Sequence, residues 1–91
     1  MAEALEIDVQ ATPNPNSMKF SLNRVVVERG SRSFFRQEQT EGLPLGRQLL
    51  AIPGVRSGFM TANFISIGRD PAGDWNEIVA KVQQVLREHF Q

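Results

Sequence analysis

The sequence predicts an α+β fold with two layers, in which an antiparallel sheet carries two helices on one face. Two pairs of short segments alternate apolar and polar residues, and turn-forming residues join the members of each pair. Each pair is followed by a segment whose apolar residues recur at helical spacing. Because hairpins on either side of a helix imply an antiparallel sheet, the expected order is β-β-α-β-β-α, with extra short strands possible at residues 25–37.

The first pair of strands is predicted at residues 5–11 and 17–22. Apolar residues alternate with polar ones in both segments, which is typical of a strand with one solvent-exposed face. Two prolines and two asparagines lie between the segments, at residues 12–16. Proline cannot donate to a sheet, and asparagine side chains bond to the nearby backbone. We therefore expect a rigid connection that closes an antiparallel hairpin.

Residues 23–42 have no single interpretation. Residues 25–27 and the pair Phe34 and Phe35 have strand preference. Residues 28–31 between them have the composition of a turn. One or two short edge strands fit this region, and a mobile loop fits it as well.

The first helix is predicted to begin at Pro44, because proline suits the first turn of a helix. Leu45, Leu49 and Ile52 then fall at positions i, i+4 and i+7 on one face. The proline–glycine pair at 53–54 ends this helix.

The second hairpin and the last helix complete the pattern. Strands are predicted at residues 55–59 and 64–67, with a turn near 61–63. Asp74 is placed to cap the last helix, and Glu77, three residues later, would complete a capping-box-like pair. The apolar stripe of this helix is continuous and consists of Trp75, Ile78, Val79, Val82, Val85, Leu86 and Phe90.

Length and charge restrict the possible functions. A chain of 91 residues makes one small domain, so we expect residues 1–91 to form a single unit. Ten basic residues balance ten acidic ones, which disfavours a general nucleic-acid binder or a protein that gathers acidic substrates. No stretch is long and apolar enough to span a bilayer, and the acidic N-terminus lacks the regions of a signal peptide. A cytoplasmic location with no membrane partner is the expectation.

No catalytic, cofactor-binding or metal-binding residue is predicted. His89 is the only histidine, and a metal site would need further ligands beside it. The spacing of Asp74 and Glu77 is explained by helix capping. The glycines match neither nucleotide-binding fingerprint, and one histidine suggests no nucleophile–base arrangement. We therefore expect that the chain is not an enzyme.

Several blocks of the sequence resemble, in order, the N-terminal domain of the Nfu/NifU-type iron–sulfur cluster scaffold proteins. The segment TPNPNSMKF at residues 12–20 is close to the hallmark of that family. The other matching blocks are residues 44–50, 52–55, 63–67 and 74–75. The resemblance covers nearly the whole chain and implies a two-layer α/β domain associated with iron–sulfur cluster assembly.

The same resemblance also marks a difference. In full-length members of this family, a separate downstream domain holds the cluster by a Cys-x-x-Cys pair. The present sequence ends at Gln91, directly after the last predicted helix, and contains no cysteine. Because clusters are normally held by cysteine thiolates, we expect this chain to bind no cofactor itself. It would meet a cluster only through a partner.

The resulting hypothesis is a non-catalytic accessory module that docks to iron–sulfur scaffold or client proteins. The candidate partner-binding residues are Arg47 at the end of the first helix or, as the alternative surface, the loop-segment residues Pro13, Asn14, Pro15, Asn16 and Lys19. An exposed strand edge near residues 25–27 is a further possibility. The loop residues also have an architectural interpretation, in which they fix the connection and set the strand register. The two roles are compatible.

An alternative is a small nucleic-acid-binding domain that uses residues 24–36. Four arginines surround Phe34 and Phe35 there, and basic grooves with aromatic residues bind single-stranded nucleic acids. These arginines are Arg24, Arg29, Arg32 and Arg36. Nearby glutamates dilute the charge, which makes nucleic acid the less favoured partner. The sequence leaves open the identity of the partner and the docking surface. It also leaves the oligomeric state open, with a monomer favoured.

Overall fold

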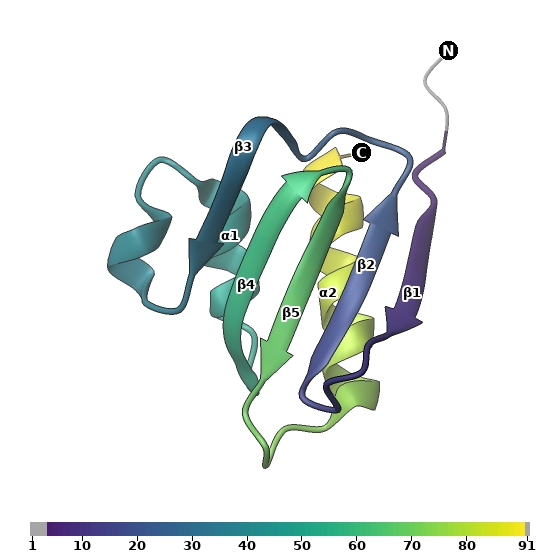
Figure 1. The fold of residues 1–91 in the computed structure, drawn as a ribbon, viewed down its shortest axis with the longest axis vertical. Helices are drawn as coiled ribbons and strands as arrows, with labels where there is room; N and C mark the ends of the chain where they lie inside the picture. The colour runs from purple at the N-terminus through teal and green to yellow at the C-terminus, as the bar shows by residue number, and fades with distance from the viewer. Residues whose placement is uncertain (1–3, 91) are drawn as a thin grey trace.

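The computed structural model describes residues 4–90 as a five-stranded antiparallel sheet with both α-helices on one side (Figure 1). The strands are β1 (Ile7–Ala11), β2 (Ser17–Leu22), β3 (Val27–Phe34), β4 (Val55–Ala62) and β5 (Phe64–Arg69). The helices are the 3-10 helix η1 (Gln37–Thr40) and the α-helices α1 (Pro44–Leu50) and α2 (Trp75–Phe90). The strand order is β1-β2-β5-β4-β3. The predicted α+β class and element order are confirmed, with β3 as the extra strand.

The two hairpins join along their second strands, so that β5 lies in the middle of the sheet. β1 pairs with β2, and β4 pairs with β5, each pair antiparallel. The hairpins then meet through β2 and β5, from the Ser17–Gly68 pair to the Ser21–Phe64 pair. This long-range pairing brings the loop at residues 12–16 beside the end of β5 and the start of α2.

The core lies between the sheet and the two α-helices. Alternate residues of the central strands face the helices and are fully buried, namely Phe20, Met60, Ile65 and Ile67. The helices contribute Leu45, Leu49, Ile78, Val82 and Leu86. Burying one such side chain contributes about 1.5–3 kcal/mol relative to leaving it exposed. The apolar faces predicted for both helices are therefore the faces that hold the two layers together.

One strand, β3, replaces the short strands and the turn predicted in this region. Residues 28–31 lie inside β3, where the register against β4 shifts between Val27 and Ser31. Gly30 has a φ of 67°, which glycine adopts readily, and its carbonyl oxygen accepts a bond of 2.8 Å from Thr61 Oγ1. The predicted turn is wrong. Residues 28–31 form a bulge inside β3, and the strand pairs with β4 on both sides of this bulge.

Phe34 joins β3, β4 and α1 inside the core. Its side chain is 1% exposed and lies across from Gly58, its pairing partner on β4. A Cβ atom built on Gly58 would lie 2.4 Å from the Phe34 ring, and one built on Gly46 of α1 would lie 3.2 Å from it. The ring therefore fits only because the residues at these two positions have no side chain.

The start of α2 has only part of the predicted capping arrangement. The Asp74 carboxylate accepts a hydrogen bond of 3.0 Å from the Asn76 N–H, as expected of a capping residue. Within residues 4–90, the Glu77 side chain makes no return bond to the Asp74 amide. The prediction of a reciprocal pair is therefore wrong, since Asp74 caps the helix alone.

The turn between β4 and β5 offers a stability prediction. Ala62 has a φ of 49°, in the left-handed region, and it is exposed. This conformation costs an L-residue about 1–2 kcal/mol, whereas glycine adopts it freely but loses about 0.5–1 kcal/mol of chain entropy. We expect Ala62→Gly to raise the free energy of unfolding by about 0.5 kcal/mol and Ala62→Val to lower it by about 1 kcal/mol. Urea denaturation measures both, and a valine variant as stable as the glycine variant would contradict the prediction.

Candidate functional site

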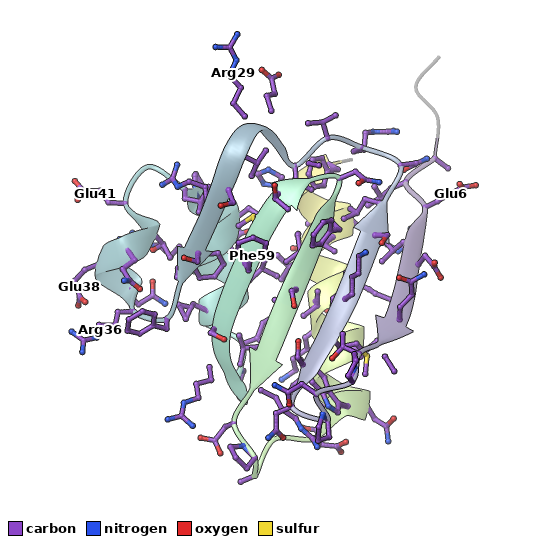
Figure 2. The ribbon with its side chains drawn as sticks, in the orientation of Figure 1. Glu6, Arg29, Arg36, Glu38, Glu41 and Phe59 are labelled. Carbon is purple, nitrogen blue, oxygen red and sulfur yellow. The ribbon has the colours of Figure 1, made fainter. Side chains whose placement is uncertain are left out.

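The sheet face opposite the two α-helices is left uncovered by residues 4–90. Figure 2 shows this face toward the viewer, with Phe59 lying over the front of β4. Two rows of paired residues cross its centre. One row consists of Ser17, Gly68 and Ser57, and the next consists of Lys19, Ser66 and Phe59. We call this surface the open face.

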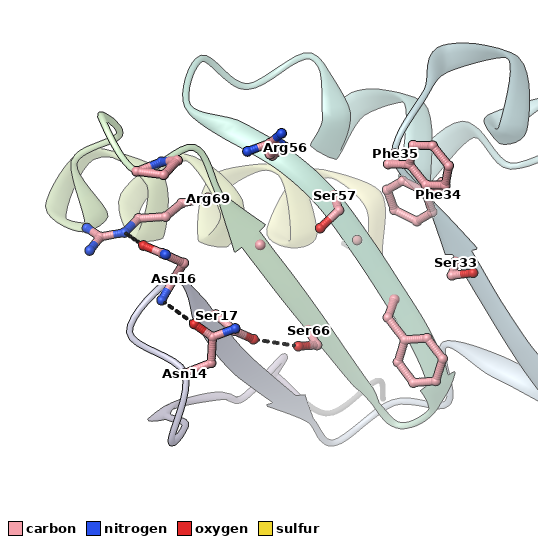
Figure 3. A pocket seen from close by; sticks show the side chains of 14 residues that line it. Asn14, Asn16, Ser17, Ser33, Phe34, Phe35, Arg56, Ser57, Ser66 and Arg69 are labelled. Carbon is pink, nitrogen blue, oxygen red and sulfur yellow. Dashed lines mark hydrogen bonds between the residues drawn. The ribbon is translucent and has the colours of Figure 1, made fainter.

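A hollow of about 430 Å³ lies on the open face, and we call it the open-face groove (Figure 3). It extends from the loop before β2, across β5 and β4, to the end of β3. Its polar lining consists of Asn14, Asn16, Ser17, Ser33, Arg56, Ser57, Ser66 and Arg69. Phe34, Phe35, Gly58, Phe59, Gly68 and Pro71 complete the wall.

The loop at residues 12–16 forms one wall of the groove and is braced by its own hydrogen bonds. The Asn16 N–H donates to Asn14 Oδ1 at 2.9 Å, and the Ser17 N–H donates to the Asn14 carbonyl oxygen at 3.0 Å. Pro15 lies at the second position of this turn, where its fixed φ is favourable. The Thr12 hydroxyl lies 2.9 Å from the Asn14 carbonyl oxygen. These bonds are the ones expected if the loop residues have an architectural role.

Two residues outside the loop hold it against α2. The Trp75 Nε1–H donates to the Pro15 carbonyl oxygen at 3.0 Å. Arg69 Nε donates to Asn16 Oδ1 at 3.3 Å, and the Arg69 guanidinium lies 5.2 Å from the centre of the Trp75 ring. The loop is therefore fixed by contacts between residues that are more than fifty positions apart in the sequence.

Positive charge at one end of the groove is not neutralised. Arg56 has no hydrogen bond or ion pair with any residue in the described range, 4–90. Among the described residues, the Arg69 side chain bonds only to neutral oxygens, those of the Asn16 side chain and the Gly73 backbone. In the part of the chain that the structure describes, no aspartate or glutamate lines the groove. The groove therefore carries two arginines without a balancing carboxylate.

Aromatic side chains lie along the rest of the open face. Phe59 is 38% exposed and Phe35 is 59% exposed, and both line the groove. Phe64 lies beyond the groove, with Lys19 Nζ 4.4 Å from the centre of its ring. Arg36 lies 5.6 Å from the centre of the Phe35 ring. The exposed rings and the cations are thus already partly paired with one another.

The predicted partner-binding residues do not form one surface. Pro13, Asn14, Pro15 and Asn16 lie together in the loop, and Lys19 lies on the open face beside it. Arg47 lies on α1, in the layer that covers the other face of the sheet (Figure 1). The structure thus groups five of the six residues and separates the sixth. The stretch at 25–27 leads into β3, where Val26 and Val27 pair with Ala62.

Sequence reasoning missed Arg56, Arg69, Ser57, Ser66 and Gly68. The two serines occupy outward positions of predicted strands, so their exposure was open to prediction. Their position beside the loop at residues 12–16 depends on the pairing of β2 with β5, which local sequence patterns do not reveal. Arg56 lies at a bulge in β4, between Val55 and Ser57, and its sequence carries no signal of that bulge.

The segment at residues 24–36 does not present both of its phenylalanines to solvent. Phe34 is in the core, and only Phe35 is exposed. Arg29 extends from the bulge of β3 at the far end of the strand from Arg36 (Figure 2). The aromatic pair that motivated the nucleic-acid alternative is therefore divided between the core and the surface.

No group of three or more histidine, aspartate and glutamate side chains within residues 4–90 is placed to hold a metal ion. His89 lies in the last turn of α2, with its ring centre 4.8 Å from that of Phe90. Among the described helices, none is long and apolar enough to cross a membrane. The interactions that the open-face groove offers are hydrogen bonds, positive charge and aromatic contact.

Comparison with known sequences identifies related proteins. The family described as "Scaffold protein Nfu/NifU N terminal" matches residues 7–91. A Drosophila ananassae protein named "NFU1 iron-sulfur cluster scaffold homolog, mitochondrial" is 34% identical over 90 residues, which are 98% of this chain and 32% of that protein. The chain spans about a third of the length of the curated relatives that it matches.

Solved structures show the same fold. The crystal structure of protein SAV1430 from Staphylococcus aureus matches with a TM-score of 0.78 and 26% identity, covering 89% of this chain and 98% of that one. The solution structure of a NifU-like protein from Saccharomyces cerevisiae matches with a TM-score of 0.77 and 26% identity. That match covers 93% of this chain and 77% of the yeast chain.

Proposed function

The chain belongs to the family of Nfu/NifU N-terminal domains, and from this membership we propose that it serves iron–sulfur cluster biogenesis as a non-catalytic docking module. It binds scaffold or client proteins, and a partner's cysteines ligate any cluster that it meets. Its own sequence has no cysteine. The cytoplasmic location and the monomeric state stay predictions.

One observation supports docking above the others: the braced loop and the uncovered sheet face together line one groove. A loop that is held by Trp75, Arg69 and its own bonds loses little conformational freedom when a partner binds. Binding residues are often found on loops positioned by a rigid scaffold. The loop at residues 12–16 therefore has both an architectural role and a role in presenting the docking surface.

The proposal that this chain does not itself ligate an iron–sulfur cluster is testable by reconstitution. When the purified chain is incubated anaerobically with ferrous iron and sulfide and then desalted, we expect no stoichiometric cluster to remain. The reason is that cluster iron needs thiolate ligands, which this chain lacks. Visible absorption and chemical assay of iron and sulfide measure the result, with a Cys-x-x-Cys scaffold domain as the positive control. A stable absorption band with one cluster per chain would show that the chain is itself a carrier.

Docking is tested by affinity capture from a cell extract, with the bound proteins identified by mass spectrometry. We expect the tagged chain to enrich iron–sulfur scaffold or client proteins. The double variant Asn14→Ala with Asn16→Ala removes two bonds that brace the loop, and it is expected to lose this enrichment while circular dichroism shows an intact fold. Arg29→Ala, on the distant β3 bulge, is the control and should retain the same partners. Equal capture by both variants would exclude the loop as the docking surface.

A further inference from the structure

We propose that the open-face groove binds an extended acidic segment of a partner protein, an inference that rests on the docking function proposed above. Carboxylates of the segment meet Arg56 and Arg69 at one end of the groove. The backbone of the segment lies over the floor of small residues on β2, β5 and β4. An apolar side chain of the segment contacts Phe35 and Phe59, which lie farther along the groove.

The charge of the groove favours an acidic segment. The chain has a net charge of zero, yet none of the carboxylates of residues 4–90 lines the groove, which holds two arginines. Several carboxylates gather instead around a separate hollow at the start of α2, lined by Asp70, Asp74 and Glu77. An uncompensated pair of guanidinium groups attracts carboxylates and orients them as they approach. The partner complementary to this groove is therefore acidic.

The floor of the groove favours an extended polypeptide backbone. Ser17, Gly68 and Ser57 are neighbours across β2, β5 and β4. Their side chains are small or absent, so a polypeptide backbone can approach the sheet closely. The Ser66 hydroxyl lies 3.2 Å from the Ser17 hydroxyl, and the Ser57 hydroxyl has no hydrogen bond within residues 4–90. These hydroxyls are both donors and acceptors, as the alternating groups of a backbone require.

The aromatic residues favour a polypeptide over a nucleic acid. Bases stack on ring faces that are free, but Lys19 Nζ lies over the Phe64 ring and Arg36 lies over the Phe35 ring. Phe34 is buried. Phe35 and Phe59 remain exposed at the end of the groove away from the braced loop, where they offer an apolar contact surface. A segment with acidic residues at one end and an apolar residue at the other matches the groove, which has arginines at one end, a floor of small residues and aromatic rings at the other end.

The test is an NMR titration of the ¹⁵N-labelled chain with degenerate pools of nine-residue peptides. One pool has glutamate at three alternate positions, the second has glutamine there, and the third has lysine. We expect the glutamate pool to shift the amide resonances of Ser57, Ser66 and Gly68 and the side-chain resonance of Arg56 in a saturable way. The glutamine pool should need a concentration at least about tenfold higher for the same shifts, and the lysine pool should cause none.

Three variants test separately the charge inside the groove, the shape of its floor and the net charge of the whole chain. Arg56→Glu is expected to weaken binding of the glutamate pool by about tenfold or more. Gly68→Val raises the floor without changing charge and is expected to weaken binding to a similar degree, since valine is favoured in strands and the fold should persist. Arg29→Glu makes the same change of net charge on the distant bulge of β3, and binding should stay unchanged. Amide dispersion in each spectrum verifies that the variant is folded.

Four outcomes would overturn the inference. The first is the absence of saturable shifts with the glutamate pool, and the second is equal binding of the glutamine pool. The third is the same set of shifts with inorganic phosphate or free glutamate at equal concentration, which would assign the groove to a small anion. The fourth is tighter binding of an oligodeoxythymidylate that Arg56→Glu abolishes, which would assign it to nucleic acid. If capture from the extract succeeds while this titration fails, the docking function stands and only the acidic segment is wrong.

Discussion

Gly58→Ala is expected to lower the free energy of unfolding by about 2–3 kcal/mol, a large effect for one added methyl group. The new Cβ atom would lie 2.4 Å from the Phe34 ring. The ring cannot move away easily, because it is 1% exposed and it also lies close to Gly46 of α1. Forcing an extra methyl group into such a packed site displaces side chains and backbone together. Urea denaturation, with m-values compared, measures the loss.

The matched control is Gly68→Ala. A Cβ atom on Gly68 would also lie 2.4 Å from its nearest neighbour, but that neighbour is Ser57 Oγ, the end of a small side chain on the open face. Rotation of this hydroxyl relieves the contact, so the expected change is within about 0.5 kcal/mol. In addition, Phe34→Leu should reduce the cost of Gly58→Ala when the two are combined, because the shorter side chain vacates the space. Equal losses at the two glycines would show that the Phe34 ring is not the cause.

Trp75→Ala is expected to lower the free energy of unfolding by about 2–3 kcal/mol and to release the loop at residues 12–16. The half-buried indole packs against the core, and Trp→Ala changes in protein cores cost about 3–5 kcal/mol, so partial burial reduces the figure. The variant also removes the Nε1–H bond to Pro15 and the ring beneath Arg69. Hydrogen exchange at the Asn16 and Ser17 amides is expected to accelerate more than exchange in the central strands.

Two further variants separate the hydrogen bond from the packing. Trp75→Phe keeps an aromatic ring but removes the donor to Pro15, which should cost about 1 kcal/mol and still accelerate exchange in the loop. Phe90→Ala removes a partly buried ring at the other end of α2. It should lower stability while leaving loop exchange at the rate set by global unfolding. The proposed bracing by Trp75 would be refuted if Phe90→Ala and Trp75→Ala accelerated loop exchange equally.

The elements that were predicted correctly are those whose pattern is local. The stripe from Trp75 to Phe90 predicted α2, because burial on one side demands helical periodicity. The spacing of Leu45, Leu49 and Ile52 predicted α1, although this helix ends at Leu50 and the buried Ile52 follows it. The alternation in residues 17–22 likewise predicted β2. The segment from 28 to 31 was misread because the composition of a bulge resembles that of a turn, and only pairing with β4 distinguishes them.

The candidate site was predicted only in part. The loop residues Pro13–Asn16 could be identified from the sequence because prolines and asparagines at adjacent positions predict a turn. Arg56, Arg69, Ser57 and Ser66 were missed, because single polar residues on strands are common and carry no signal of a shared site. Lys19 and Arg47 were candidates for alternative docking surfaces, and the structure places them in opposite layers of the molecule, which a sequence does not show.

By itself, the sequence determined the fold class, the helix faces, the rigid turn between the first two strands and the lack of any thiolate ligand. These properties follow from the periodicity and turn residues of short segments or from the overall composition, neither of which depends on how distant segments pair. The tertiary structure alone decided that β2 pairs with β5, that Trp75 and Arg69 hold the loop, and that two arginines share a groove without a carboxylate. Such arrangements join residues far apart in the sequence, and only the packing of the whole domain selects among the many pairings that local patterns permit.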